Sequence, residues 1–393
     1  MNIMVQLKKG VYWVGVVDWD LKNFHGYITH RGSTYNSYLI VSDKIAVVDT
    51  VKAPFYETWV RHIKEHVDPK KIDYIVSNHA EPDHSGSLSK FYKEEAPQAT
   101  IIATERGKNI ITKYYGEMPI TTTKEIPELS LGGKTLSFVA VPMAHWPDSM
   151  VSYIPEDKIL LSNDAFGQHL ASVGRFDDEV DQLKLWHETK AYYANILMPL
   201  RSAVGRAIKA LGGLSIELIA PSHGVIWRKN IEAILDKYHQ WIEGYSEPKV
   251  IIAYDTMWNS TKILAYAIAE GVTSEGVECN VYNLSVNHRS DVITDILESK
   301  AVLVGSPTLN NHVYPSVAEF LAYMRGLKPM NKIGAAFGSY GWGGGATRFV
   351  EEQMKLTGIE LMENDLDCLF KPTEDEWRHA YDFGVTVAKR VKG

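Results

Sequence analysis

Four side chains that can bind metal ions lie within six consecutive positions of this 393-residue chain: His79, Glu81, Asp83 and His84. They follow a short apolar run that ends at Val76. Because alternate residues of an extended segment point to the same side, we expect His79, Glu81 and Asp83 to point together. His84 is then directed elsewhere and could serve a second ion. The spacing therefore predicts a metal site that holds two ions.

Three further metal-capable residues each follow a predicted strand: His145, Asp164 and His223. The strands are Leu136–Val141, Lys158–Leu161 and Leu218–Pro221. Loops at strand ends are where a rigid scaffold presents functional groups, so we expect all seven residues to form one site. Other histidines fit ordinary polar positions, namely His66, His169, His187, His239 and His312.

The elements that must position these side chains divide the chain into two predicted domains, 1–248 and 249–393. The first domain alternates strands with helices. Its further predicted strands are Val11–Val17, Tyr35–Val41, Lys44–Asp49, Lys71–Val76, Ala99–Ala103 and Met150–Ile154. Its predicted helices are Pro54–His66, Ser87–Glu95, Glu105–Tyr115, Gln182–Leu197 and Arg201–Leu211.

After Pro248 the pattern changes to five β–α units, which predict a parallel sheet with helices on both faces. The predicted strands are Val250–Tyr254, Val277–Leu284, Ala301–Gly305, Lys332–Phe337 and Leu366–Phe370. An open sheet of five strands and this size suits the strand order 2-1-3-4-5.

Three polar loops follow the first, third and fourth of these strands, where open α/β sheets bind ligands. Hydroxyls and N–H groups at a helix N-terminus can bind a phosphate, and aromatic and glycine residues suit a flat ring. No lysine or arginine lies in the first loop. The candidate binding residues are Thr256, Met257, Trp258, Asn259, Ser260, Thr261, Ser306, Pro307, Thr308, Leu309, Asn310, Asn311, Ser339, Tyr340, Gly341, Trp342, Gly343 and Gly344.

Composition excludes several classes of protein. A net charge of -7 argues against a general binder of nucleic acids or anionic membranes. Two cysteines cannot supply the four thiolates of a rubredoxin-type iron, so any such centre must belong to another protein. We find no secretory signal and no apolar run of membrane-spanning length, and we expect a cytoplasmic protein.

The pattern His79-x-Glu81-x-Asp83-His84, with His145, Asp164 and His223, resembles the metallo-β-lactamase fold, whose usual motif is His-x-His-x-Asp-His. Glu81 replaces the second histidine, and such an oxygen-rich site suits iron or manganese better than zinc. The segments 78–86 and 145–150 resemble one branch of that superfamily, the flavodiiron proteins. This resemblance covers essentially the whole chain, and the three loops after Pro248 resemble the FMN site of flavodoxin.

The resemblance implies a metallo-β-lactamase-like αββα sandwich followed by a flavodoxin-like doubly wound parallel sheet. It implies that His79, Glu81 and His145 bind one iron. Asp83, His84 and His223 would bind the other, although water replaces the equivalent of His84 in some relatives. Asp164 would bridge the two ions. His25 and Tyr193 occupy motifs that this family shows near its iron pocket, where either could donate a hydrogen bond or a proton.

The implied activity is reduction of O2 to water, of NO to N2O, or of both. Electrons would pass through FMN from an external donor, which a rubredoxin or a deazaflavin could provide. Family members form head-to-tail dimers, so a homodimer or a dimer of dimers is implied. Two alternatives stay open: a binuclear zinc hydrolase, and an electron-transfer module with an inactive metal site.

Overall fold

The computed structural model describes residues 5–393, which form two compact units. The first unit runs to Tyr192 and resumes over Leu200–Tyr238, and the second comprises Tyr193–Pro199 and His239–Gly393. The first strand of the second unit, β17, covers Glu247–Tyr254. The domain boundary at residue 248 stays a prediction.

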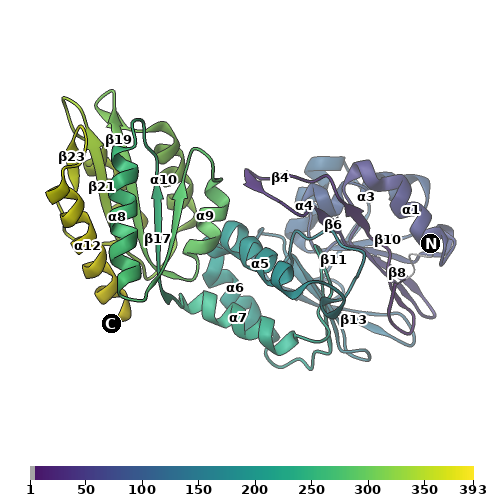
Figure 1. Cartoon of the computed structure of the whole chain (residues 1–393). Coiled ribbons are helices and arrows are strands. Elements are labelled where there is room, and N and C mark those ends of the chain that lie inside the picture. Colours follow the sequence, from purple (N-terminus) through teal and green to yellow (C-terminus); the bar gives the residue numbers. More distant parts are fainter. Residues whose placement is uncertain (1–4) are drawn as a thin grey trace. The chain divides into compact units, whose positions relative to one another are not determined.

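The first unit contains two stacked sheets (Figure 1). One has the order β1-β2-β7-β8-β9-β10-β11. Its strands are Val5–Lys8, Val11–Trp13, Tyr38–Val41, Ile45–Val48, Tyr74–Val76, Thr100–Ala103 and Ile120–Thr122. The other has the order β12-β13-β14-β15-β16. Its strands are Glu128–Ser130, Thr135–Ala140, Met150–Ile154, Ile159–Asn163 and Leu218–Pro221.

Alternating side chains bury both faces of the first sheet. In β8, Ala46 and Val48 pack between the two sheets, where Met150 and Leu161 of the second sheet meet them. Val47 points the opposite way into a second core, beneath three helices. These helices are α1 (Tyr56–Lys64), α3 (Leu88–Glu94) and α4 (Glu105–Tyr115). The period of two in the sequence thus gives a sheet with two buried faces, as a layered α/β fold requires.

The strand predicted over Val11–Val17 is wrong as a single strand. The structure breaks it into β2 and β3 (Val16–Asp18), and β3 pairs with β6 (Ser33–Tyr35) in a separate small sheet. At Gly15 a side chain would lie 2.4 Å from the carbonyl oxygen of Tyr35, so only glycine allows this close crossing.

The helix predicted over Gln182–Leu197 ends earlier. Helix α5 covers Gln182–Tyr192, and a π-helical stretch covers Tyr193–Leu197 before helix α6 begins at Arg201 and runs to Leu211. The apolar spacing of the sequence cannot distinguish a π-helical turn from an α-helical one. The last helix assigned in part to this unit, α7, covers Ile231–Glu243.

The second unit confirms the predicted parallel sheet. Its order is β18-β17-β19-β21-β22, with β23 also parallel to β21, which is the order 2-1-3-4-5 with the fifth strand in two pieces. The strands after β17 are β18 (Glu278–Asn283), β19 (Ser299–Leu309), β21 (Ile333–Tyr340), β22 (Glu360–Leu361) and β23 (Asp367–Leu369). A short strand, β20 (His312–Val313), folds back antiparallel on β19.

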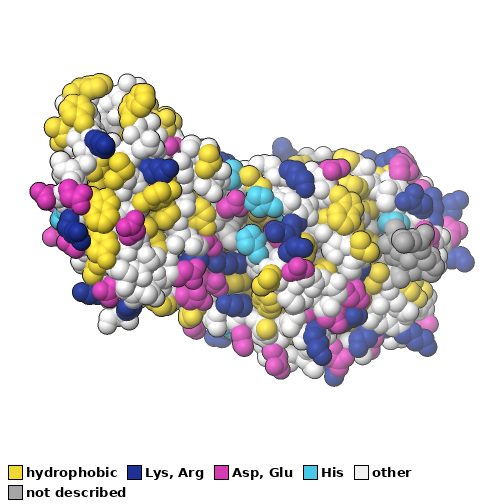
Figure 2. All heavy atoms as spheres, in the orientation of Figure 1, with side chains coloured by type: hydrophobic (Ala, Val, Ile, Leu, Met, Phe, Trp, Pro, Cys, Tyr) yellow, Lys and Arg dark blue, Asp and Glu magenta, His cyan; other side chains and the backbone are white. Residues whose placement is uncertain are grey.

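Helices cover both faces of this sheet. Helices α8 (Ser260–Ser274) and α12 (Glu374–Lys392) pack on the face that carries Ile252 and Leu303. Helices α9 (Arg289–Ile296), α10 (Pro315–Leu327) and α11 (Ala346–Thr357) are the others. No helix in the described part of the chain is long and apolar enough to cross a membrane. Lysine, arginine, aspartate and glutamate side chains are interspersed over the visible face of each unit (Figure 2).

Candidate metal centre and cofactor pocket

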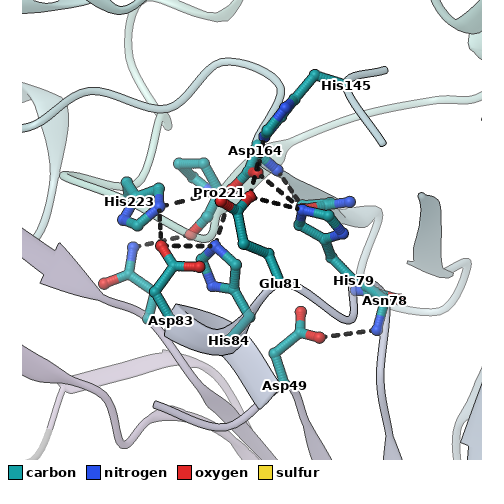
Figure 3. A network of polar contacts seen from close by, with 12 residues as sticks. Asp49, Asn78, His79, Glu81, Asp83, His84, His145, Asp164, Pro221 and His223 are labelled. Carbon is teal, nitrogen blue, oxygen red and sulfur yellow. Dashed lines mark hydrogen bonds and ion pairs between the residues drawn. The ribbon is translucent and has the colours of Figure 1, made fainter. Parts of the chain in front are cut away.

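Four loops of the first unit bring the seven predicted metal residues together (Figure 3). The loop after β9 carries four of them, and the loops after β13, β15 and β16 carry His145, Asp164 and His223. All seven side chains except that of His145 are buried, with exposures of 5% or less. The residues of this site lie up to 144 positions apart in the sequence, from His79 to His223.

The residues fall into two groups, each compact enough for one ion. The first group is His79, Glu81, His145 and Asp164, and the second is Asp83, His84 and His223. Within each group the candidate ligand atoms lie within 4.8 Å of one another.

Asp164 lies between the two groups (Figure 3). Its Oδ2 is 2.9 Å from His145 Nε2 and 3.6 Å from His79 Nε2. Its Oδ1 is 3.1 Å from His84 Nε2 and 3.7 Å from His223 Nε2. One carboxylate therefore presents one oxygen to each group, which is the arrangement of a ligand that bridges two ions.

The expectation that His79, Glu81 and Asp83 point together is wrong for Asp83. The extended backbone ends at Glu81, and Pro82 begins a short helical turn, α2 (Pro82–Ser85). Proline suits the first helical position because it lacks an N–H, and an N–H at that position would have no partner within the helix. The turn directs Asp83 toward the second group, where Asp83 Oδ2 lies 3.2 Å from His223 Nε2.

Hydrogen bonds at the far side of two imidazoles turn their Nε2 atoms toward the centre. His79 Nδ1 lies 3.4 Å from Asp148 Oδ2, and His223 Nδ1 lies 2.7 Å from the carbonyl oxygen of Thr34. When Nδ1 carries the proton it donates to these acceptors, and Nε2 keeps a lone pair for a metal ion. The loop after β9 is also fixed by Asp49, whose Oδ1 accepts a hydrogen bond from the N–H of Asn78 at 2.7 Å.

Charge balance in the centre fits deprotonated metal ligands. Burial opposes ionisation of Asp164 and Asp83, yet His84 and the other imidazoles hold the pKa of both carboxyls below the usual range. Burial lowers the pKa of His84, but the two carboxylates outweigh it and raise that pKa to about 9. Protonated imidazoles thus balance the carboxylates here, and divalent cations would take over that role when they bind.

Both oxygens of Asp83 and Oδ1 of Asp164 are buried and accept no hydrogen bond from the described residues. Buried carboxylate oxygens are normally satisfied, so these three atoms fit the coordination of metal ions. Imidazole nitrogens mixed with several carboxylate oxygens favour iron or manganese over zinc.

Of the two predicted proton donors, the structure brings His25 to the centre. The turn between β4 (Asn23–Phe24) and β5 (Tyr27–Ile28) places His25 Nε2 2.7 Å from Glu81 Oε1. This hydrogen bond is the main cause that raises the pKa of His25.

Tyr193 belongs to the second unit, where its ring lies 4.8 Å from that of Trp241. The rings of its neighbour Tyr192 and of Tyr35 do lie beside a predicted ligand, at 6.0 and 5.9 Å from that of His223. The proposed role of Tyr193 stays a prediction.

Two residues near the centre were missed by sequence reasoning. His169, expected to be ordinary, is fully buried with its ring 4.7 Å from that of His223, and its Nδ1 lies 2.7 Å from Ser33 Oγ. Burial and the neighbouring His223 hold the pKa of His169 well below its usual value. Asp148 contacts His79, and its position in the segment that follows His145 was the only available signal.

A separate pocket of about 580 Å³ opens in the second unit at the carboxyl ends of β17, β19 and β21. Thirteen of the eighteen predicted cofactor residues line it, together with Phe370, which was not predicted. The other five are Thr256, Asn259, Thr261, Ser306 and Gly344. Phe370 follows β23, whereas the sequence predicted it as the last residue of the fifth strand, and an aromatic residue at that strand end was the available signal.

The pocket fits a flat ring that carries a phosphate. Trp258 and Trp342 stand at its rim and are 88% and 96% exposed, so their faces are available for stacking. Among residues 5–393, neither lysine nor arginine lines the pocket. Ser260, the first residue of α8, lines the pocket, and a helix N-terminus suits a phosphate. Thr256 Oγ1, in the loop that precedes α8 and outside the pocket lining, is buried without a hydrogen-bond partner in the described chain.

Comparisons with known proteins find a separate family match in each half of the chain. The family described as ODP family beta lactamase matches residues 34–224, and the flavodoxin family matches residues 252–384. A nitric oxide reductase from Moorella thermoacetica is 45% identical over the full length of both chains.

Solved structures are similar over nearly the whole chain. The rubredoxin oxygen:oxidoreductase from Desulfovibrio gigas has a TM-score of 0.95 and 36% identity, covering 99% of this chain and 98% of that one. The flavodiiron protein from Giardia intestinalis has a TM-score of 0.95 and 35% identity, covering 99% and 97%.

Proposed function

Because the chain belongs to the family of flavodiiron proteins, we propose that it is an oxidoreductase that reduces O2 to water, NO to N2O, or both. The observation that carries this proposal is Asp164, whose two oxygens face two separate groups of ligands. A pair of ions held by one carboxylate can act on one small molecule together, as two isolated sites cannot.

In this proposal His79, Glu81 and His145 hold one iron, Asp83, His84 and His223 hold the other, and Asp164 bridges them. The pocket after β17, β19 and β21 holds FMN. The irons would supply one electron each to a diatomic substrate, and FMN would deliver electrons singly from an external donor.

Residues of the chain orient the metal ligands and keep bulk water away from them. The Nδ1 contacts of His79 and His223 hold both rings with Nε2 directed inward. Burial of the ligands excludes bulk water, which strengthens every electrostatic interaction among them. His25 can hold a proton at Nε2 beside Glu81, close to where reduced oxygen atoms would need one.

We further propose a rubredoxin as the electron donor, with a deazaflavin as the alternative. The two cysteines, Cys279 and Cys368, are both free, which also suits the reducing cytoplasm. A head-to-tail homodimer, or a dimer of such dimers, is proposed because Trp258 and Trp342 at the rim of the pocket are strongly exposed, and a second chain would cover them. Sedimentation equilibrium of the FMN-loaded protein tests this assembly, and a monomer at micromolar concentration would refute it.

The test of the function is metal analysis, a visible spectrum and anaerobic stopped-flow mixing of the reduced protein with O2 and with NO. We expect two irons and one FMN per chain, and rapid reoxidation by at least one gas. Zinc without flavin would favour a hydrolase and refute the proposal. Flavin without iron would favour an electron-transfer module with an inactive metal site.

A further inference from the structure

Asp148 is a buried carboxylate beside the centre that belongs to neither group of ligands. It is 3% exposed, and its Oδ2 accepts from the N–H of Ala80 at 2.7 Å and lies 3.4 Å from His79 Nδ1. Thr104 Oγ1 donates to the backbone carbonyl of Asp148 at 3.0 Å and fixes that end of the loop. Its carboxylate is therefore held against one particular imidazole.

The partners of the other imidazoles differ in charge. His223 Nδ1 faces the neutral carbonyl of Thr34 at 2.7 Å. His84 Nδ1 is buried and has no hydrogen-bond partner among the described residues. Of these three rings, only that of His79 has an anion at Nδ1, the nitrogen that points away from the centre. A carboxylate on the far nitrogen makes an imidazole a more basic metal ligand, because it stabilises the positive charge that the ring shares with the ion.

The ligand charges themselves do not distinguish the two groups. Each has one carboxylate of its own, Glu81 or Asp83, and each takes one oxygen of Asp164. Asp148 is thus an extra negative charge that contacts His79, whereas the other buried carboxylate, Asp49, acts on His84 and on His79 only through space.

His25 acts in the opposite direction, since it contacts Glu81 Oε1 at 2.7 Å and can draw charge from that ligand. Its side chain is 65% exposed, whereas that of Asp148 is 1% exposed. Solvent screens an exposed group far more strongly than a buried one, so the effect of Asp148 prevails.

We propose that Asp148 is a positioning residue that fixes the proton of His79 on Nδ1 and makes the two irons unequal. The iron held by His79, Glu81 and His145 then has the lower midpoint potential of the two Fe(III)/Fe(II) couples, and it is the first to give up its electron. This inference rests on the proposed di-iron function.

The test compares Asp148→Asn with a matched control, Asp49→Asn. Asp49 is also 3% exposed and also accepts from a backbone N–H beside His79, that of Asn78 at 2.7 Å. Within the described chain it makes no hydrogen bond or ion pair with an imidazole, and it interacts with His84 and His79 only through space. Both substitutions remove a buried negative charge and nearly preserve the shape of the side chain. Only Asp148→Asn removes the anionic partner of His79.

The measurement is a redox titration of the ⁵⁷Fe-loaded proteins followed by Mössbauer and EPR spectroscopy, with the affected iron assigned from the Glu81→Ala variant. We expect Asp148→Asn to raise the midpoint potential of the iron at His79 and to bring the two potentials closer together. Asp49→Asn should shift that potential less. Iron affinity at this position should fall about 10- to 100-fold in Asp148→Asn, as for other partners of metal ligands.

Equal shifts in Asp148→Asn and Asp49→Asn, or unchanged potentials in Asp148→Asn with both irons bound, would overturn the inference. If Asp148→Asn does not fold, Asp148→Glu is measured instead, because this variant keeps the negative charge. Midpoint potentials that match those of the wild type would support the role of the charge. A changed order of the two Fe(III)/Fe(II) couples would overturn the inference. A wild-type protein without two irons would instead refute the proposed function.

Discussion

Replacing Glu81 by alanine should remove one iron and leave the other. Glu81 Oε2 lies 3.1 Å from His79 Nε2 and 3.4 Å from His145 Nε2, among the atoms of the first group. The variant keeps three of the four candidate ligands of this group and all of the second group.

The magnitude follows from the ligand count. Partners that only contact a metal ligand already contribute 10- to 100-fold to affinity, so the loss of a ligand should weaken the first iron by at least about 100-fold. At about 1.4 kcal/mol for each tenfold change, this is about 2.8 kcal/mol. Iron content should fall from two toward one per chain, with O2 and NO turnover lost in proportion.

The assay combines metal analysis, the flavin spectrum and stopped-flow reoxidation. FMN content should stay unchanged, because the FMN pocket is built by residues of the second unit. A matched control is Glu188→Ala, which removes another buried glutamate that pairs with Arg31 and stands in neither ligand group. The control should keep two irons. Full iron content and full turnover in Glu81→Ala would refute its role as a ligand.

Three further outcomes are expected. Trp342→Ala should weaken FMN binding by about tenfold through lost stacking, measured by fluorescence titration, whereas Leu356→Ala, which changes an exposed α11 residue outside the pocket, should not. Gly384→Val should destabilise the second unit by about 1–3 kcal/mol in urea unfolding, because a Cβ there would lie 2.1 Å from the carbonyl oxygen of Ile268; retained stability would contradict this close helix crossing. Burial lowers the pKa of His66 in the folded chain. As the pH falls, the His66 imidazole therefore takes up a proton in the unfolded chain before it does so in the folded chain, and the free energy of unfolding decreases as the pH drops through about 6.5. His66→Gln should therefore lose less stability than the wild type between about pH 8 and about pH 5, and an identical loss would show that His66 does not contribute.

The layered fold was largely predictable because its signals are local and repeated. Five β–α units admit few right-handed parallel arrangements, so the strand order 2-1-3-4-5 could be expected from the pattern of apolar runs alone. The break of Val11–Val17 could not, because it depends on how closely Gly15 approaches Tyr35 from another strand.

Orientation at the site was predictable only in part. Asp83 comes two residues after Glu81, which suggests that the two side chains point the same way. Pro82 instead starts a helical turn, which directs Asp83 toward the other group of ligands. Sequence spacing likewise could not show that Tyr192, rather than Tyr193, has its ring beside His223. A shift of one position along a helix changes which side chain faces a site.

The sequence alone determined which side chains could bind metals, that they follow strand ends, and that Glu81 replaces a histidine. Those properties are carried by residue type and local spacing. Tertiary structure decided that Asp164 turns one oxygen to each group and that Asp148 faces His79 while a neutral carbonyl faces His223. These contacts join loops from separate strands, and their geometry is set by how the two sheets pack.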